Sequence, residues 1–397
     1  MNMSTYPPFP FGHPAATVVY VLLYVLTLSI HVVFMNYVLA GSFFMAFLTL
    51  FPGRDQSRAG SMTMAVLRDW MPFFISAAIT AGIAPLLFIQ ILYQTEFYTA
   101  NLLLFSRWMA ILPALIVGFY FAYLLKTDFL KERHPLLRGI IAIVAVACFC
   151  YVAFAWTENY SLSVRSQMEW ADFYQKGRLL ELDMGVLSRL MIWISGAFPT
   201  MAAMLGWQLW YCQRRGQEVS RAQMRLIAIL AVAGWIGSVL FAFLYSQTLT
   251  EFNQFVLIRK YDGLGWVIMA ATGGVLSVGS WIVQWQQWRF RAWCLIVAST
   301  GSLLGIVGMN MLRELLRSIQ LTISMHYDDH AAYAKVGGIT LFLGCLIANA
   351  ILSAVCFFLV RRGKLAVEPE AGGELIRRRR CDFRCLDPKS RIISRHA

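Results

Sequence analysis

The stretch Leu26–Leu48, LTLSIHVVFMNYVLAGSFFMAFL, decides the fold class of this chain. Apart from His31 and four small polar residues it is apolar, and it exceeds the roughly 20 residues that a helix needs to cross a bilayer. His31 is the only histidine of the sequence that lies inside a hydrophobic run. Because an ionisable side chain in a bilayer is costly, an intramembrane histidine indicates a function by default.

The composition indicates that the whole chain, and not this stretch alone, lies in a membrane. With 59% hydrophobic and only 14% charged residues and a mean hydropathy of +0.60, the 397 residues have the composition of a polytopic membrane protein. Runs of bilayer-crossing length occur at about 17–51, 72–93, 105–125, 138–157, 187–212, 224–248, 263–287, 292–312 and 337–360. We therefore predict an all-α polytopic bundle of about nine transmembrane helices over residues 17–360. An outer segment, 1–16, precedes it and a basic tail, 361–397, follows.

The placement of charge predicts the orientation. The net charge of +13 alone is compatible with nucleic-acid binding, but most of the 34 lysines and arginines fall on one side when the sides alternate with each span. Acidic residues divide almost evenly between the two sides. The positive-inside rule then places the N-terminus outside and the C-terminus in the cytoplasm, and we predict no nucleic-acid partner.

His31 is the first candidate for a binding residue. Imidazole is the usual axial ligand of haem iron, so His31 is a candidate haem ligand. The alternative is a neutral membrane histidine that hydrogen-bonds a neighbouring carbonyl or Asn36. The sequence leaves both interpretations open.

Met191 and Met269 are further candidate haem ligands. Each lies a few residues into a span that enters from the outside, so both fall at roughly the depth of His31. A thioether sulfur can ligate haem iron. However, the chain has 18 methionines, and most of them must serve packing alone.

Polar residues near the predicted outer side supply three more candidates. His326 and His330 are four residues apart, so on a helix they share a face and can hold a metal or a haem. The alternative is a solvated polar loop. Arg313 follows the apolar part of the eighth span and is interpreted either as an interface ion pair with Glu314 or as an anchor for a haem propionate.

Other chemistry has no support in the sequence. The eight cysteines include no C-x-x-C-H motif, which argues against covalently attached haem, and Cys381 and Cys385 in the tail lack two further zinc ligands. No P-loop, no G-x-G-x-x-G motif and no nucleophile–base pair is present.

At this point the chain resembles subunit I of the cytochrome bd oxidase superfamily. Nine spans match the family, and His31 followed by an apolar helix with Gly41 resembles its first span, whose histidine ligates a high-spin haem. Residues 70–90, WMPFFISAAITAGIAPLLFIQ, resemble its second span, and the Trp156–Asn159 exit resembles the end of its fourth. Ser195, Gly196, Gly206, Trp210 and Tyr211 fall in the register of its fifth span, and Val267-Ile268-Met269 matches the segment whose methionine ligates the low-spin haem.

The sequence also departs from the family pattern. The histidine of the family's fifth span falls on Met191. The acidic pair of the third span is absent, since SRWMAILPALIVGFYFAYLLK contains no Asp or Glu. The outer quinol-binding loop shrinks to roughly 249–262. The resemblance therefore implies the scaffold with His31, as in divergent members that work with c-type cytochromes, and not quinol oxidation or oxygen reduction by this chain alone.

We predict a haem b-bearing, multi-pass subunit of a respiratory electron-transfer complex in the bacterial inner membrane. Its partners are membrane lipids, other subunits of the complex and a periplasmic c-type cytochrome, which His326 or His330 would face. Whether the chain is itself an oxidoreductase is left open. The alternatives are a cofactor-free anchoring subunit of such a complex and a membrane transporter, the latter prompted by the Gly and Pro residues that interrupt the second and fifth spans.

Overall fold

A computed structural model describes residues 15–50, 58–127, 135–178, 180–259, 263–321, 332 and 338–366. Every regular element among these residues is a helix. Within these ranges, nine helical stretches are long and apolar enough to span a membrane, at Thr17–Leu50, Met62–Leu92, Phe105–Leu124, Leu136–Ser163, Met184–Arg214, Arg221–Ser246, Gly263–Gln286, Ala292–Gln320 and Ile339–Cys356. The prediction of an all-α, multi-pass membrane protein is confirmed.

The chain divides into two units, Met1–Ala334 and Lys335–Ala397. The long helices of the first are α1 (Ala15–Leu50), α2 (Arg58–Leu92), α5 (Ile111–Leu124), α7 (Pro135–Ser163), α9 (Met184–Arg214), α10 (Arg221–Ser246), α12 (Gly263–Gln286) and α13 (Ala292–Gln320). In the second unit the described residues form one long helix, α15 (Ile339–Ala366).

Helix α1 is the centre of the first unit because it packs against α2, α7, α9 and α13. Its buried Tyr37 illustrates these contacts. The ring of Tyr37 stacks on Phe74 of α2 at 3.9 Å between centroids, and its hydroxyl donates to Oε1 of Gln208 on α9 at 2.9 Å. The helix is continuous, and its 36 residues exceed the thickness of a bilayer, so the ends extend beyond the hydrocarbon or the helix tilts.

Small residues bring α12 and α13 into close contact. A Cβ atom added at Gly273 would lie 2.5 Å from the carbonyl oxygen of Gly301, closer than real Cβ atoms approach any heavy atom. Glycine is therefore required at Gly273, and the small residues of the seventh span serve tight helix packing.

This contact makes a testable prediction. We expect Gly273→Ala to destabilise the protein by about 1–3 kcal/mol because the backbones of α12 and α13 must separate. Gly279→Ala is the matched control, since an added Cβ there meets nothing within 4 Å. Thermal unfolding in detergent measures both variants, and equal melting temperatures would contradict the assigned contact.

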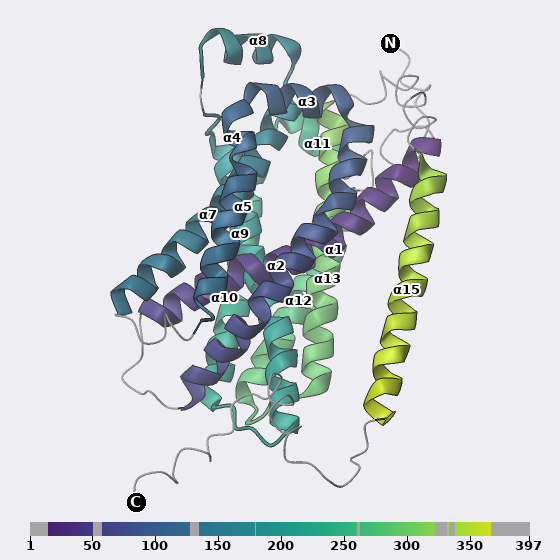
Figure 1. Cartoon of the computed structure of the whole chain (residues 1–397). Helices are drawn as coiled ribbons and strands as arrows, with labels where there is room; N and C mark the ends of the chain where they lie inside the picture. The colour runs from purple at the N-terminus through teal and green to yellow at the C-terminus, as the bar shows by residue number, and fades with distance from the viewer. Residues whose placement is uncertain are drawn as a thin grey trace, which may run out of the picture. The chain divides into compact units, whose positions relative to one another are not determined.

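The short helices α3 (Gln94–Leu103), α4 (Phe105–Met109), α8 (Gln167–Gln175) and α11 (Glu251–Arg259) gather at one end of the first unit, as Figure 1 shows. This is the end predicted to face outside. Helix α8 begins with a capping box in which Ser166 and Glu169 satisfy each other's backbone N–H groups. This short helix lies in the long connection between α7 and α9.

Candidate functional site

His31 lies on the face of α1 that contacts α2. Its Nδ1 atom is 2.9 Å from the carbonyl oxygen of Ala78. A Cβ atom added at Gly82 would lie only 3.0 Å from Cε1 of the imidazole, so the absence of a side chain at Gly82 gives the ring its place against α2. The side chain is half-buried.

The hydrogen bond to Ala78 decides the tautomer of His31. A carbonyl oxygen can only accept, so Nδ1 carries the proton and donates it, and Nε2 of the neutral ring keeps its lone pair. Among the described residues Nε2 has no hydrogen-bond partner. Metal-ligating histidines commonly hold their second ring nitrogen in this way, with an N–H donated to a backbone carbonyl. The hydrogen bond from Nδ1 to the Ala78 carbonyl is the one that the interpretation of His31 as a neutral membrane histidine predicts. The lone pair of Nε2 is also available to ligate a metal ion.

Two asparagines near His31 leave buried acceptors without partners. Asn36 donates to Oγ1 of Thr200 on α9 at 3.1 Å, and Asn310 of α13 donates to Oγ of Ser29 at 3.0 Å. The Oδ1 atoms of both asparagines are buried and have no hydrogen bond. Because a buried unpaired carbonyl costs about 1–3 kcal/mol, these oxygens indicate that a further polar group belongs between α1, α9 and α13.

A second polar site lies toward the predicted outer end of the bundle. We call it the buried arginine cluster, and it consists of Arg189 of α9, Tyr160 of α7, and Arg313, Glu314 and Arg317 of α13. The three guanidinium carbons lie 3.2 Å (Arg189), 4.4 Å (Arg317) and 5.2 Å (Arg313) from the centroid of the Tyr160 ring. Such cation–π contacts are favourable and stronger when desolvated.

The buried arginine cluster has an excess of positive charge. Its only carboxylate is that of Glu314, which lies 3.7 Å from Nη1 of Arg317 and 3.8 Å from Nε of Arg313 and accepts a hydrogen bond of 3.1 Å from the hydroxyl of Tyr93. Glu314 and Arg317 are 0% and 1% exposed. Arginine stays protonated in proteins, so Arg313 and Arg317 share the one carboxylate of Glu314 in a medium where unpaired charge is costly.

Several donors of this cluster are unpaired. Nε and Nη1 of Arg317 and Nε of Arg313 are buried and have no hydrogen-bond partner. Buried donors of this kind fit an anion that carries carboxylate groups, since guanidinium and carboxylate match each other in geometry. A haem propionate meets that requirement.

Tyr24 connects the two sites. It lies close enough to Arg317 for an electrostatic interaction and is seven residues before His31 on α1, which places Tyr24 and His31 on the same helix face about 10 Å apart along the axis. A porphyrin has similar dimensions from its central iron to the ends of its propionates.

The other residues that the sequence predicts for the site lie in different parts of the chain. Arg313 belongs to the buried arginine cluster. Met191 in α9 and Met269 in α12 are half-buried. His326 and His330 lie outside the described residues. No group of three or more His, Cys, Asp or Glu side chains that can hold a metal ion occurs within the described ranges.

Sequence reasoning missed Arg189, Arg317 and Tyr160. A signal for Arg317 was present, because it follows Arg313 by four residues and Glu314 by three, and side chains at these spacings are neighbours on a helix. Arg189 and Tyr160 carry no comparable local signal, since they join the cluster from α9 and α7.

Glu158 forms a separate buried ion pair at the same end. Its carboxylate accepts two hydrogen bonds from Arg107, of 2.6 and 3.0 Å, and one of 2.7 Å from the backbone N–H of Glu181. The side chain of Glu158 is 0% exposed. The pair ties α4, α7 and the segment after α8 together, so its role is to position the outer loop.

We expect Glu158→Gln to loosen this loop. Hydrogen bonds to charged groups contribute about 1.5–3 kcal/mol, so the loop should open about tenfold more often. Trypsin reports the change by faster cleavage after the exposed Lys176 and Arg178. Glu169→Gln is the control, because it keeps the capping box and removes only a half-exposed charge. Equal cleavage rates in the two variants would contradict the role given to Glu158.

Comparison with known proteins supports the fold. No family model matches the sequence, and no curated protein matches it. Among solved structures the chain is similar to one described as the structure of bd oxidase from Geobacillus thermodenitrificans, with a TM-score of 0.64 and 13% sequence identity over 91% of this chain and 99% of that chain. The resemblance to the bd oxidase superfamily is confirmed at the level of the fold.

Proposed function

We propose that this chain is a haem-bearing integral subunit of a bacterial respiratory electron-transfer complex. The observation that carries the proposal is the geometry of His31 in a bd oxidase-like fold. Its Nδ1 is committed to the carbonyl of Ala78, and its Nε2 is left to bind a metal.

His31 would hold the iron of a haem b, and Arg313 and Arg317 would hold its propionates. When bound, haem b supplies one-electron transfer. The fit rests on the unpaired Nε atoms of both arginines and on the excess positive charge of their cluster. The protein's own contribution is to orient the imidazole, to neutralise the propionates and to keep the site away from bulk water.

The remaining assignments follow from the position of this site near the predicted outer end. We assign the electron partner to a periplasmic c-type cytochrome, with His326 and His330 facing it, and the chain to the inner membrane. Met191 and Met269 remain candidate ligands of a second haem. Each of these assignments rests on the sequence and the shared fold.

A cofactor-free anchoring subunit is the second candidate. The observation that favours it is that groups of the protein itself engage these side chains, since the Ala78 carbonyl accepts from His31 and the Tyr160 ring stacks with the three arginines. One absorption measurement of haem content separates the two candidate functions. A pyridine haemochrome assay on the purified full-length chain should detect haem b if the first holds, and haem found only in a co-purified partner chain would establish the second.

A further inference from the structure

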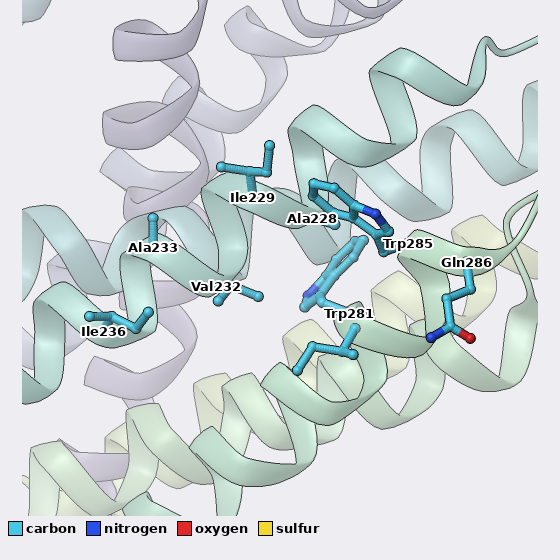
Figure 2. Close-up of a pocket in the computed structure, with 9 residues that line it drawn as sticks. Ala228, Ile229, Val232, Ala233, Ile236, Trp281, Trp285 and Gln286 are labelled. Carbon is cyan, nitrogen blue, oxygen red and sulfur yellow. The ribbon is translucent and has the colours of Figure 1, made fainter.

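A groove runs between α10 and α12, away from His31 and the buried arginine cluster. Its apolar walls include Ile229, Val232 and Ile236 of α10 and Trp281, Ile282 and Trp285 of α12, and its volume is about 430 Å³. Figure 2 shows Ala228 and Val232 of α10 beside the indole rings of Trp281 and Trp285. The volume falls within the usual range for small-molecule sites.

We propose that this groove binds an anionic glycerophospholipid, with one acyl chain between the helices and the phosphate on Arg221 and Arg225. The proposal is independent of haem. It rests on the length of the stripe that α10 presents along the groove, on Arg221 and Arg225, which stack on Trp288 and on Trp285 of the groove wall, and on a buried indole N–H within the groove.

The length of the groove suits an acyl chain. Arg225, Ile229, Val232 and Ile236 follow one another at helical spacing and form one stripe along α10. From Arg225 to Ile236 the stripe rises about 16 Å, which is about half of a hydrocarbon core of roughly 30 Å. The stripe therefore covers one leaflet, starting at the end of α10 that the positive-inside rule places in the cytoplasm.

The mouth of the groove is cationic and lacks a counter-ion. The guanidinium of Arg221 lies 4.1 Å from the ring of Trp288, and that of Arg225 lies 5.5 Å from the ring of Trp285. The Nε atoms of both arginines are buried and have no hydrogen-bond partner, and no carboxylate within the described ranges pairs with either side chain. A phosphate would accept from both guanidinium groups.

The position of these arginines strengthens the case for an anion. They lie in the first two turns of α10, where the positive end of the helix dipole disfavours cations. A bound phosphate offsets both that repulsion and the repulsion between the two arginines. Basic pockets between transmembrane helices bind anionic lipid headgroups for this reason.

Trp281 provides a second polar contact for a glycerophospholipid. It is 1% exposed and lines the groove, and its Nε1–H is buried without a partner. Trp281 lies one helical turn deeper than Trp285, the residue on which Arg225 stacks. A glycerophospholipid carries its ester carbonyls just below the phosphate, at the depth where this N–H needs an acceptor.

The test measures lipid binding to the full-length chain in detergent by native mass spectrometry. Phosphatidylglycerol and phosphatidylcholine with identical acyl chains are titrated in parallel. We expect the parent to prefer phosphatidylglycerol. We expect Arg221→Gln/Arg225→Gln to weaken that lipid about thirtyfold, because each basic residue near a membrane surface contributes about 1 kcal/mol. Val232→Trp, which fills the groove, should abolish retention of both lipids at this site.

The matched control is Arg214→Gln/Arg215→Gln. These arginines carry the same charge near the same end of the bundle, but they stack on Trp210 and Tyr211 of α9, outside the groove. The control should bind phosphatidylglycerol as the parent does, and thermal unfolding verifies that all variants fold. Equal binding of the two lipids by the parent, equal losses in both double variants, or retention of an isoprenoid quinone in place of the lipid would each overturn the proposal.

Discussion

The His31→Ala variant should lose the haem that the parent chain binds at this site. Changing a group that only hydrogen-bonds a metal ligand already costs about 10–100-fold in metal affinity, and removal of the ligand itself should cost at least as much. The measurement is haem per chain by pyridine haemochrome, together with the reduced-minus-oxidised spectrum. Added imidazole should restore part of the spectrum, because it can occupy the space that the side chain leaves.

Two further variants separate ligation from folding. Ile30→Ala changes an exposed neighbour on the same helix and should keep the parental haem content. Gly82→Val should reduce haem content without touching His31, because a side chain at Gly82 displaces the imidazole that lies 3.0 Å away. If His31→Ala keeps the parental haem content, or if Ile30→Ala loses as much haem as His31→Ala does, His31 is not the haem ligand.

The Glu314→Gln variant should produce the largest loss of stability. It removes the only carboxylate of the buried arginine cluster and leaves Arg313 and Arg317 beside Tyr160 without their anion. Removing one partner of a buried ion pair costs about 3–5 kcal/mol. Thermal unfolding of the purified chain in detergent measures the effect.

Asp172→Asn is the comparison for this variant. Asp172 also pairs with two basic residues, Lys176 and Arg178, but its side chain is 46% exposed. Exposed pairs contribute about 0–1 kcal/mol because water screens them, so this variant should unfold close to the parent. If Glu314→Gln and Asp172→Asn melt alike, the buried arginine cluster contributes no more to stability than a surface ion pair.

The fold was largely predictable because its signal is local. A run of about 20 apolar residues must form a helix in a bilayer, since each backbone N–H and carbonyl needs a partner within the segment. The nine predicted spans therefore match the described spans closely, with the second extended toward its start at Met62 and the eighth toward its end at Gln320. The helix in the outer loop was predictable for a similar reason, because Ser166 and Glu169 have the spacing of a capping box.

The candidate site was predictable only in part. His31 and Arg313 stand out in the sequence because charged or ionisable side chains are rare in apolar runs. The tautomer of His31 depends on Ala78, and the charge excess around Arg313 depends on Arg189 and Tyr160, which come from other helices.

The sequence by itself determined a multi-pass helical membrane protein with one intramembrane histidine and a strong asymmetry of positive charge. The tertiary structure alone decided which nitrogen of His31 is available, which arginines share the single carboxylate of Glu314, and where α10 and α12 leave a groove. The physical reason is the separation along the chain over which each kind of interaction acts. Hydropathy and capping act within a few turns of one helix, whereas hydrogen bonds and buried charges depend on how helices distant in the sequence pack together.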